Sequence, residues 1–357
     1  MKKVLLATTM LVAGASIAAA EVTLSGDARM GIVGGGIDNA ATAQDEGATV
    51  FTSRARVAFT LSGESDSGLS FGASFRADNA GGAAAGTAGS VFISGAFGKL
   101  TMGDVDGAAQ MATGHVAGVG LTGLGDLNES TFIGAGGLNA VNQAFAAPAT
   151  TANPLETNDP TLLYEYSAGA FTGYFSLTNP ADINNGSPAP LNMSSNAQAI
   201  AFGAKYTFGD YTIGLGHEQL KGFIVAAGGA APTVAAAAVD NTNLKNTVVS
   251  VSGTVAGLTM KAVYGKASGT LAGVNVVAPG FNGKQYALSA SYTTGAITGT
   301  AFYADDSGIR GLGGTAGYGI GGSYDLGGGA SVVGGVAKTK VAGPDTTTFD
   351  LGVSFKF

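Results

Sequence analysis

The 357-residue sequence contains no cysteine and no tryptophan, and only 11% of its residues are charged. Without cysteine, the chain has no disulfide scaffold and no thiol-ligated metal or redox site. No apolar run after residue 20 is long enough to span a bilayer as a helix. The most apolar stretch, residues 224–239, contains Pro232 and is expected to be a loop. The mean hydropathy of the chain is positive. Membrane-spanning helices do not explain this value.

The first twenty residues have the pattern of a secretory signal peptide. Lys2 and Lys3 form a positive start, residues 4–17 are mostly apolar, and three alanines ending at Ala20 fit a cleavage site. A membrane anchor is the alternative, but the apolar stretch is too short and is interrupted by small residues. We expect Sec export with cleavage after Ala20, which leaves a single domain, residues 21–357.

The charge balance argues against nucleic acid as a partner. Without the two lysines of the signal peptide, 15 basic residues stand against 24 acidic ones, a net charge of −9. Binding to a phosphate backbone needs a basic face, so nucleic-acid binding is not expected.

Alternation of apolar and polar residues runs through the rest of the chain. It is clearest at the C-terminus, where every second residue from Phe349 to Phe357 is apolar and the residues between are small, polar or charged. Such strands have one face for lipid and one for water. The pattern predicts sixteen strands, at residues 22–33, 51–62, 69–78, 90–97, 99–105, 161–168, 170–178, 198–208, 211–220, 246–256, 258–266, 284–294, 296–304, 314–325, 329–338 and 346–357.

Eight long polar or Gly/Ala-rich connections alternate with seven short turns between these strands. An even number of amphipathic strands with this loop asymmetry predicts an all-β fold, a transmembrane antiparallel β-barrel of sixteen strands, in the outer membrane of a Gram-negative cell. A soluble β-sandwich also alternates, but it accounts neither for the signal peptide nor for the loop asymmetry. A barrel of this size leaves an aqueous channel. Without tryptophan, the aromatic girdles of the barrel must consist of tyrosine and phenylalanine.

Four arginines fall on the polar faces of the first three predicted strands: Arg29, Arg54, Arg56 and Arg76. Neighbouring strands bring them onto one patch of the lumen wall, where a strip of charge sets ion selectivity. The alternative is that they only solubilise the lumen or pair with Asp27 and Asp78.

The third long connection, about residues 106–160, is longer than ordinary loops and is therefore expected to carry function or to be disordered. Six acids lie at its start or within it: Asp104, Asp106, Asp126, Glu129, Glu156 and Asp159. If the connection folds into the lumen, these acids face the arginines and narrow the pore; a mobile exterior loop is the alternative. Asp104 and Asp106 are also weak calcium-ligand candidates, because the spacing of an EF-hand is missing.

Other motifs carry no function. Residues 118–123 and 317–322 both match the dinucleotide pattern G-x-G-x-x-G, but neither opens a helix in a βαβ unit, and glycine is abundant. His115 lies in the third connection and His217 on the predicted lipid face, and neither has a partner for zinc or nucleophilic catalysis. We therefore expect no enzymatic activity and no cofactor.

Several runs are similar to the Rhodobacter-type general diffusion porins, over nearly the whole mature chain: residues 21–31, 53–57, 66–75, 94–99 and 323–331. This resemblance implies a homotrimer of sixteen-stranded barrels, each with its own pore. In each barrel the third extracellular loop folds inward and forms the constriction of the pore, the eyelet. It assigns the four arginines to the basic side of the eyelet and the loop acids, most securely Asp104, to the acidic side. The loop carries fewer acids than the family pattern, so only a weak cation preference is expected.

The resulting hypothesis is a water-filled outer-membrane channel for small hydrophilic solutes and ions, with weak cation preference. Lipid and lipopolysaccharide are the expected membrane partners. Two rivals stay open from the sequence, a substrate-specific channel of the same fold and a plugged structural or adhesive barrel. The predicted inward faces consist mostly of Ser, Thr, Gly and charged residues, which favours the unspecific pore.

Overall fold

A computed structural model describes residues 21–35, 49–78, 89–132, 161–178, 198–222, 242–271, 274–275, 283–306, 316–340 and 345–357. The expected signal peptide, residues 1–20, lies outside them. The strands are β1 (Glu21–Gly35), β2 (Val50–Glu64), β3 (Ser70–Asp78), β4 (Gly89–Gly95), β5 (Gly98–Gly103), β6 (Thr161–Ala168), β7 (Phe171–Thr178), β8 (Gln198–Phe208), β9 (Tyr211–Gly222), β10 (Thr242–Val255), β11 (Leu258–Leu271), β12 (Val274–Asn275), β13 (Lys284–Thr294), β14 (Ile297–Asp305), β15 (Ala316–Gly327), β16 (Ala330–Lys340) and β17 (Thr346–Lys356). One short helix, α2 (Ala108–Thr113), follows β5.

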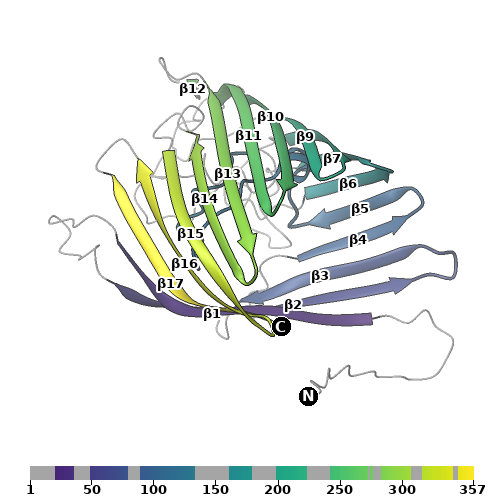
Figure 1. Ribbon diagram of the computed structural model, residues 1–357. Helices are drawn as coiled ribbons and strands as arrows, with labels where there is room; N and C mark the ends of the chain where they lie inside the picture. The colour runs from purple at the N-terminus through teal and green to yellow at the C-terminus, as the bar shows by residue number, and fades with distance from the viewer. Residues whose placement is uncertain are drawn as a thin grey trace, which may run out of the picture.

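Sixteen of these strands form one closed antiparallel barrel (Figure 1). Each strand pairs with its neighbours in sequence, and the ring closes because β1 pairs with β17 as well as with β2, for example Ala28 opposite Phe355. The two-residue strand β12 only extends the pairing at the end of β11, which pairs with β13 along its length. The predicted barrel of sixteen strands is therefore confirmed.

The predicted strand ends agree with the structure to within five residues, and the largest differences are at the long connections. β10 begins at Thr242 and β11 continues to Leu271, whereas alternation predicted a start at 246 and an end at 266. Asn243 pairs with Thr270 and Lys245 with Ser268. Polar residues mark these ends in the sequence, but the backbone pairing continues through them because it does not depend on apolar side chains.

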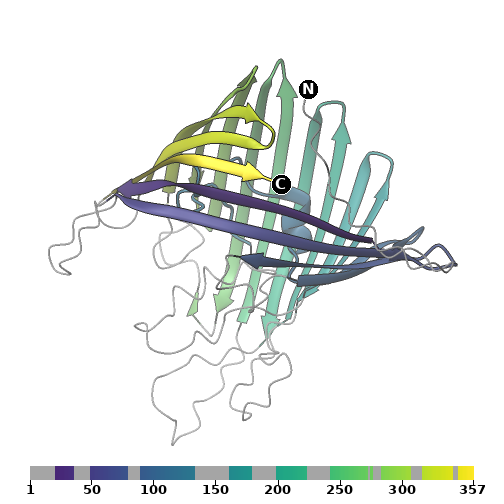
Figure 2. The same cartoon turned by 90° about the horizontal axis from the view of Figure 1, so that it is seen from below.

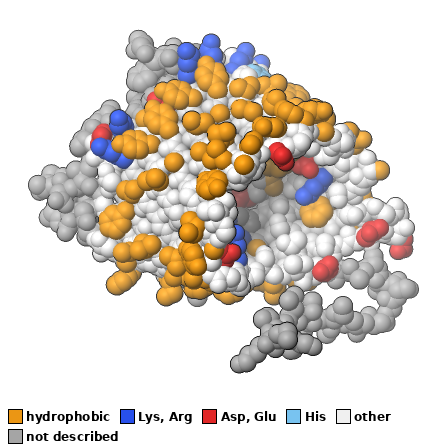
Figure 3. Space-filling view, in the orientation of Figure 1, with side chains coloured by type: hydrophobic (Ala, Val, Ile, Leu, Met, Phe, Trp, Pro, Cys, Tyr) orange, Lys and Arg blue, Asp and Glu red, His pale blue; other side chains and the backbone are white. Residues whose placement is uncertain are grey.

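The outer face of the barrel is apolar and aromatic (Figure 3). Exposed side chains on β1 and β2 include Val22, Leu24, Met30 and Phe51. Among the aromatic side chains of the barrel, Phe75, Tyr206, Tyr292 and Phe357 are exposed, and Phe59 stacks on Phe75 with ring centroids 4.7 Å apart. In a water-soluble protein such a surface would aggregate, so its neighbour is lipid or protein.

The well-buried residues gather inside the barrel instead of between two sheets. Residues 104–132, which follow β5, are called here the inner segment; α2 lies within it and contacts β7, β8, β9 and β10. Figure 2 shows α2 enclosed by these strands. No helix among the described residues is long and apolar enough to cross a membrane.

Candidate functional site: the lumen and the inner segment

The four predicted arginines lie on the inner face of three adjacent strands. Because Val22, Leu24 and Met30 are exposed outside, the alternate residues of β1 point inward, and Arg29 is among them. Arg29 pairs in register with Arg54 of β2. On the same face Arg56 lies opposite Asp27, and Arg76 of β3 opposite Ala58. The structure thus brings the four together as an arginine wall (Arg29, Arg54, Arg56 and Arg76).

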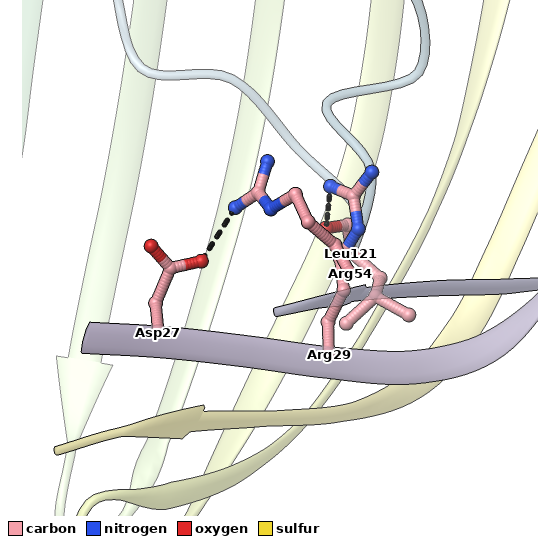
Figure 4. A network of polar contacts seen from close by, with 4 residues as sticks. All are labelled: Asp27, Arg29, Arg54 and Leu121. Atoms are coloured by element: carbon pink, nitrogen blue, oxygen red, sulfur yellow. Dashed lines mark hydrogen bonds and ion pairs between the residues drawn. The ribbon is translucent and has the colours of Figure 1, made fainter. Parts of the chain in front are cut away.

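Two of these arginines have well-defined partners (Figure 4). Arg54 Nη2 forms an ion pair with Asp27 Oδ1 at 2.7 Å, a diagonal contact between β2 and β1. Arg29 Nη1 donates to the carbonyl oxygen of Leu121 in the inner segment at 3.1 Å. One arginine is therefore partly neutralised by a wall carboxylate, and another holds the inner segment to the wall.

The inner segment enters the lumen along β7, β8 and β9. The backbone N–H of Ala108, at the start of α2, donates to Ser176 Oγ of β7 at 2.8 Å. Glycines make room for the helix on the strands behind it; a Cβ atom on Gly216 of β9 would lie 2.7 Å from Ala109 Cα. Further along, the N–H of Ala117 donates to Ser289 Oγ of β13 at 3.0 Å. The segment thus crosses the inner face from β7 towards β13.

The middle of the inner segment, around Thr122, is fixed to β17. Asp350 is 3% exposed, and its Oδ2 accepts hydrogen bonds from Thr122 N at 2.6 Å and Thr122 Oγ1 at 2.7 Å. Gly120 has φ +86°, and a Cβ atom there would lie 2.6 Å from Asp350 Oδ1. Together with Arg29 and Leu121, these contacts hold the segment against the seam where β17 meets β1.

The segment then returns to β10, β13 and β14, where Thr131 is bound by polar side chains of the wall. Its N–H donates to Gln285 Oε1 at 2.7 Å, its carbonyl accepts from Asn246 and Gln285, and its hydroxyl donates to Asp306 Oδ2 at 2.7 Å. Asn246 also donates to Glu218, which is fully buried. Sequence reasoning missed this network, because its members are isolated polar residues far apart in the chain.

His115 joins the two halves of the inner segment. Its Nδ1 accepts from the backbone N–H of Ser130 at 2.9 Å, its Nε2 lies 3.2 Å from Gln110 Nε2, and its ring packs edge-on against Phe132. Burial, with the nearby charge of Lys261 as a smaller cause, lowers the pKa of His115 to about 4. The imidazole is thus neutral at pH 7, which its role as acceptor from Ser130 requires.

The loop acids lie in two separate places. Asp104 and Asp106 line a hollow of about 320 Å³ on the inner face of β4 to β6, together with Lys99 and Glu165. Asp126 and Glu129 line another hollow of about 270 Å³, together with Asp305 and Asp306 beside β14. Glu156 and Asp159 lie outside the described residues.

Asp106 lies in the first hollow. Burial, and to a smaller extent the charge of Asp104, raises the pKa of Asp106, and Gln110 donates to its Oδ1 at 2.9 Å. Within the described part of the chain, no three His, Cys, Asp or Glu residues are grouped to hold a metal ion. Calcium binding by Asp104 and Asp106 stays a prediction.

The glycine pattern at residues 317–322 has a structural explanation. It belongs to β15, where Gly319 and Gly321 face inward and a Cβ atom on either would lie 2.9 Å from side-chain atoms of Val119. Residues 118–123 are the middle of the inner segment, which lies against this strand. The two matches to the dinucleotide pattern are thus the two sides of one close contact. Alternate glycines on a strand were a signal that something packs against its inner face.

Comparison with known proteins decides what this channel is. A model of the family described as Gram-negative porin matches residues 7–344. The chain belongs to the Gram-negative porin family. It is 38% identical to a porin of Rhodobacter capsulatus over 337 residues, which cover 94% of this chain and all of that protein.

Solved porin structures agree with this assignment. One porin structure, 33% identical, superposes with a TM-score of 0.66 and covers 94% of this chain and 100% of that one. A variant of Rhodopseudomonas blastica porin superposes with a TM-score of 0.59 at 18% identity and the same coverage, which supports the fold. The chain is an outer-membrane general diffusion porin, a passive channel and not an enzyme.

Proposed function

We propose that the passage in this porin runs between the arginine wall and the inner segment, where solutes are screened by size and by charge. The observation that carries the proposal is the position of the inner segment, which is fixed to β7, β13 and β17 from inside the barrel. The arginine wall stands on β1 to β3, and Arg29 touches the segment where the two meet. Charges fixed across a narrow aqueous gap set the local potential for ions.

We further propose a weak cation preference. Three observations support it: the net charge of −9 without the signal peptide, the acids Asp104 and Asp106 at the start of the inner segment, and the ion pair that neutralises Arg54. The remaining arginine charge opposes cations, which keeps the preference modest.

A homotrimer is proposed as the assembled form. All eleven tyrosines lie between Tyr164 and Tyr324, so the arc from β16 through β1 to β5 carries none. Tyrosine marks the surface of a membrane protein that meets the lipid headgroups. The arc without tyrosine, with Phe59 stacked on Phe75 on its outer face, is therefore the proposed contact between protomers.

The contact can be mapped with single cysteines, because the chain has none of its own. Val57→Cys lies on the tyrosine-free arc and Leu288→Cys on β13, and both positions are exposed in the protomer. Maleimide labelling of the native protein in detergent should reach Leu288→Cys and spare Val57→Cys. Equal labelling of both would contradict the proposed interface.

The pore is tested by single-channel recording in a planar bilayer under a salt gradient. We expect large steps in groups of three and a reversal potential that shows modest cation preference. Saturable flux of one solute class would indicate a substrate-specific channel. Folded, heat-modifiable protein without steps would indicate a plugged barrel. Addition of calcium should lower the conductance only if Asp104 and Asp106 bind it.

A further inference from the structure

Two lysines face the lumen from strands that lie across the barrel from the arginine wall (Figure 1): Lys205 on β8 and Lys261 on β11. Tyr206 and Met260 are exposed on the outer face, so the lysines next to them point inward. Both lysines are half-buried. Each lies a few residues from a short turn. Because the short turns of an outer-membrane barrel are periplasmic, the two lysines lie in the periplasmic half of the lumen.

The two lysines lack a carboxylate partner among the described residues. Neither forms an ion pair or a hydrogen bond with a described acid. Glu165, on the inner face of β6, lines the hollow that contains Lys99 instead. The charges of Lys205 and Lys261 are close enough to repel each other. Partly buried charges without a partner are costly, and a bound anion would remove this cost.

Contacts with uncharged groups hold both ammonium groups in place. Lys205 Nζ lies 5.3 Å from the ring centroid of Tyr174 on β7, a cation–π contact. Lys261 reaches the end of α2, where a Cβ atom on Gly114 would lie 2.9 Å from its Nζ. The carbonyl groups at a helix end attract a cation, but they supply at most roughly half an elementary charge. Both lysines are thus oriented and still charged, which lowers the entropy cost of binding an anion.

The wall between the two lysines carries hydroxyl groups. Ser252 of β10 lies opposite Lys261, and Thr212 of β9 lies opposite Ser252. Hydroxyl groups donate hydrogen bonds to the oxygens of an anion. The lysines stand three strand spacings apart, about 14 Å between their backbones, and their long side chains narrow this gap from both ends. Such a spacing suits a molecule with an acid group at each end better than a single-atom anion.

We propose that Lys205 and Lys261 form a binding site for small organic anions with two acid groups, such as dicarboxylates. One carboxylate binds Lys205 and the other binds Lys261, while Ser252 and Thr212 donate to the remaining oxygens. The ligand neutralises both lysines and removes their repulsion. The inference rests on the proposed passage, because solutes that leave it enter the half of the lumen where this site lies. It adds a class of solute that the lumen retains.

Binding is measured on the purified full-length protein in neutral detergent. NMR of lysines methylated with ¹³C reads each ammonium group, and methylation keeps its charge. The probes are succinate, inorganic phosphate and acetate at equal ionic strength. The test variants are Lys205→Gln, Lys261→Gln and the double variant, and the single variants also assign the signals. The matched control is Lys99→Gln, which removes another lysine of the lumen.

We expect succinate to shift the signals of Lys205 and Lys261 with one common midpoint concentration, in the wild type and in the Lys99→Gln control. In either single variant the remaining lysine should need at least about tenfold more succinate. Equal midpoints in the wild type and the single variants would overturn the proposal, as would equal midpoints for succinate and acetate. Phosphate that binds as tightly as succinate would contradict the requirement for two separate acid groups.

Single-channel recording separates this site from the proposed passage. In potassium chloride alone the double variant should still form open channels, which verifies its folding. Succinate should raise the cation preference of the wild type and of Lys99→Gln, because it neutralises two positive charges of the lumen, and it should leave the double variant unchanged. Open channels with no response to succinate in either measurement would refute the site alone. Succinate binding to a protein that forms no channels would refute the passage alone.

Discussion

Thr122 and Asp350 are 228 positions apart in the chain, yet the Asp350 carboxylate accepts two hydrogen bonds from Thr122, at 2.6 and 2.7 Å. The contact fixes the middle of the inner segment to the last strand of the barrel. Asp350 itself is buried, so the pair is shielded from competing water. The shape of the passage thus depends on a contact between a loop and a strand that closes the ring.

Replacement of Asp350 by alanine should loosen the inner segment around Thr122. Two donors of Thr122 lose their acceptor, which costs about 1–3 kcal/mol of local stability. We expect noisier single-channel currents, with the barrel still folded. The exposed carboxylate of Asp325, near a short turn, provides the control variant Asp325→Ala, whose current noise should equal that of the wild type. Quiet currents from Asp350→Ala would show that the contact does not hold the segment.

Two glycines of the inner segment allow the effect of backbone strain to be separated from the effect of a steric clash with Asp350. Gly120 and Gly125 have nearly equal positive φ angles, +86° and +83°. A Cβ atom at Gly120 would lie 2.6 Å from Asp350 Oδ1, whereas nothing lies within 4 Å of one at Gly125. Alanine at either position costs about 1 kcal/mol of strain, but only Gly120→Ala should also disturb conductance. Identical currents from both variants would contradict this.

The double variant Arg54→Ser/Arg56→Ser should widen the eyelet and raise the cation preference. It removes two positive charges and leaves Asp27, the ion-pair partner of Arg54, uncompensated in the lumen. The reversal potential under a salt gradient measures the change. The control is Lys245→Gln/Lys266→Gln, which removes two positive charges from the outer face and so changes the net charge by the same amount. An unchanged reversal potential would exclude Arg54 and Arg56 from a role in selectivity.

The buried His115 predicts a pH dependence of the inner segment. Its pKa of about 4 in the folded protein lies below the usual value of 6.5. As pH falls from 6.5 towards 4, the unfolded chain takes up the proton first, so the stability from neutral His115 is complete above 6.5 and is progressively lost down to about 4.

The pKa of His115 can be measured by NMR of labelled imidazole in a His217→Gln background, where it is the only histidine. We expect a titration midpoint near 4. A midpoint near 6.5 would mean that the ring is solvated and that Ser130 has another acceptor.

The sequence was informative about strands because alternation is a local property. Phe349 to Phe357 alternate regardless of what surrounds them, and the same rule placed Arg29 and Arg54 on the inner face. Alternation failed to predict strand ends made of polar residues, as at Lys245, which belongs to β10 although the predicted strand began at residue 246. The roles proposed for the loop acids are untested, and the structure divides the described ones between two hollows.

The contacts of the inner segment were not predictable in the same way. Nothing near Thr131 in the sequence points to Gln285, Asn246 or Asp306, which come from three other parts of the chain. Glycines at 319 and 321 were visible, but their meaning, room for Val119, needed the neighbouring loop in place.

The sequence by itself determined the barrel: the number of strands, the face of each residue and the asymmetry between turns and loops, because these follow from a two-residue period and from chain punctuation. Only the tertiary structure decided how the lumen is filled. Ring closure brings β17 beside β1, and only then do Asp350, Arg29 and the inner segment meet. Such contacts depend on distances across the barrel, which no local pattern encodes.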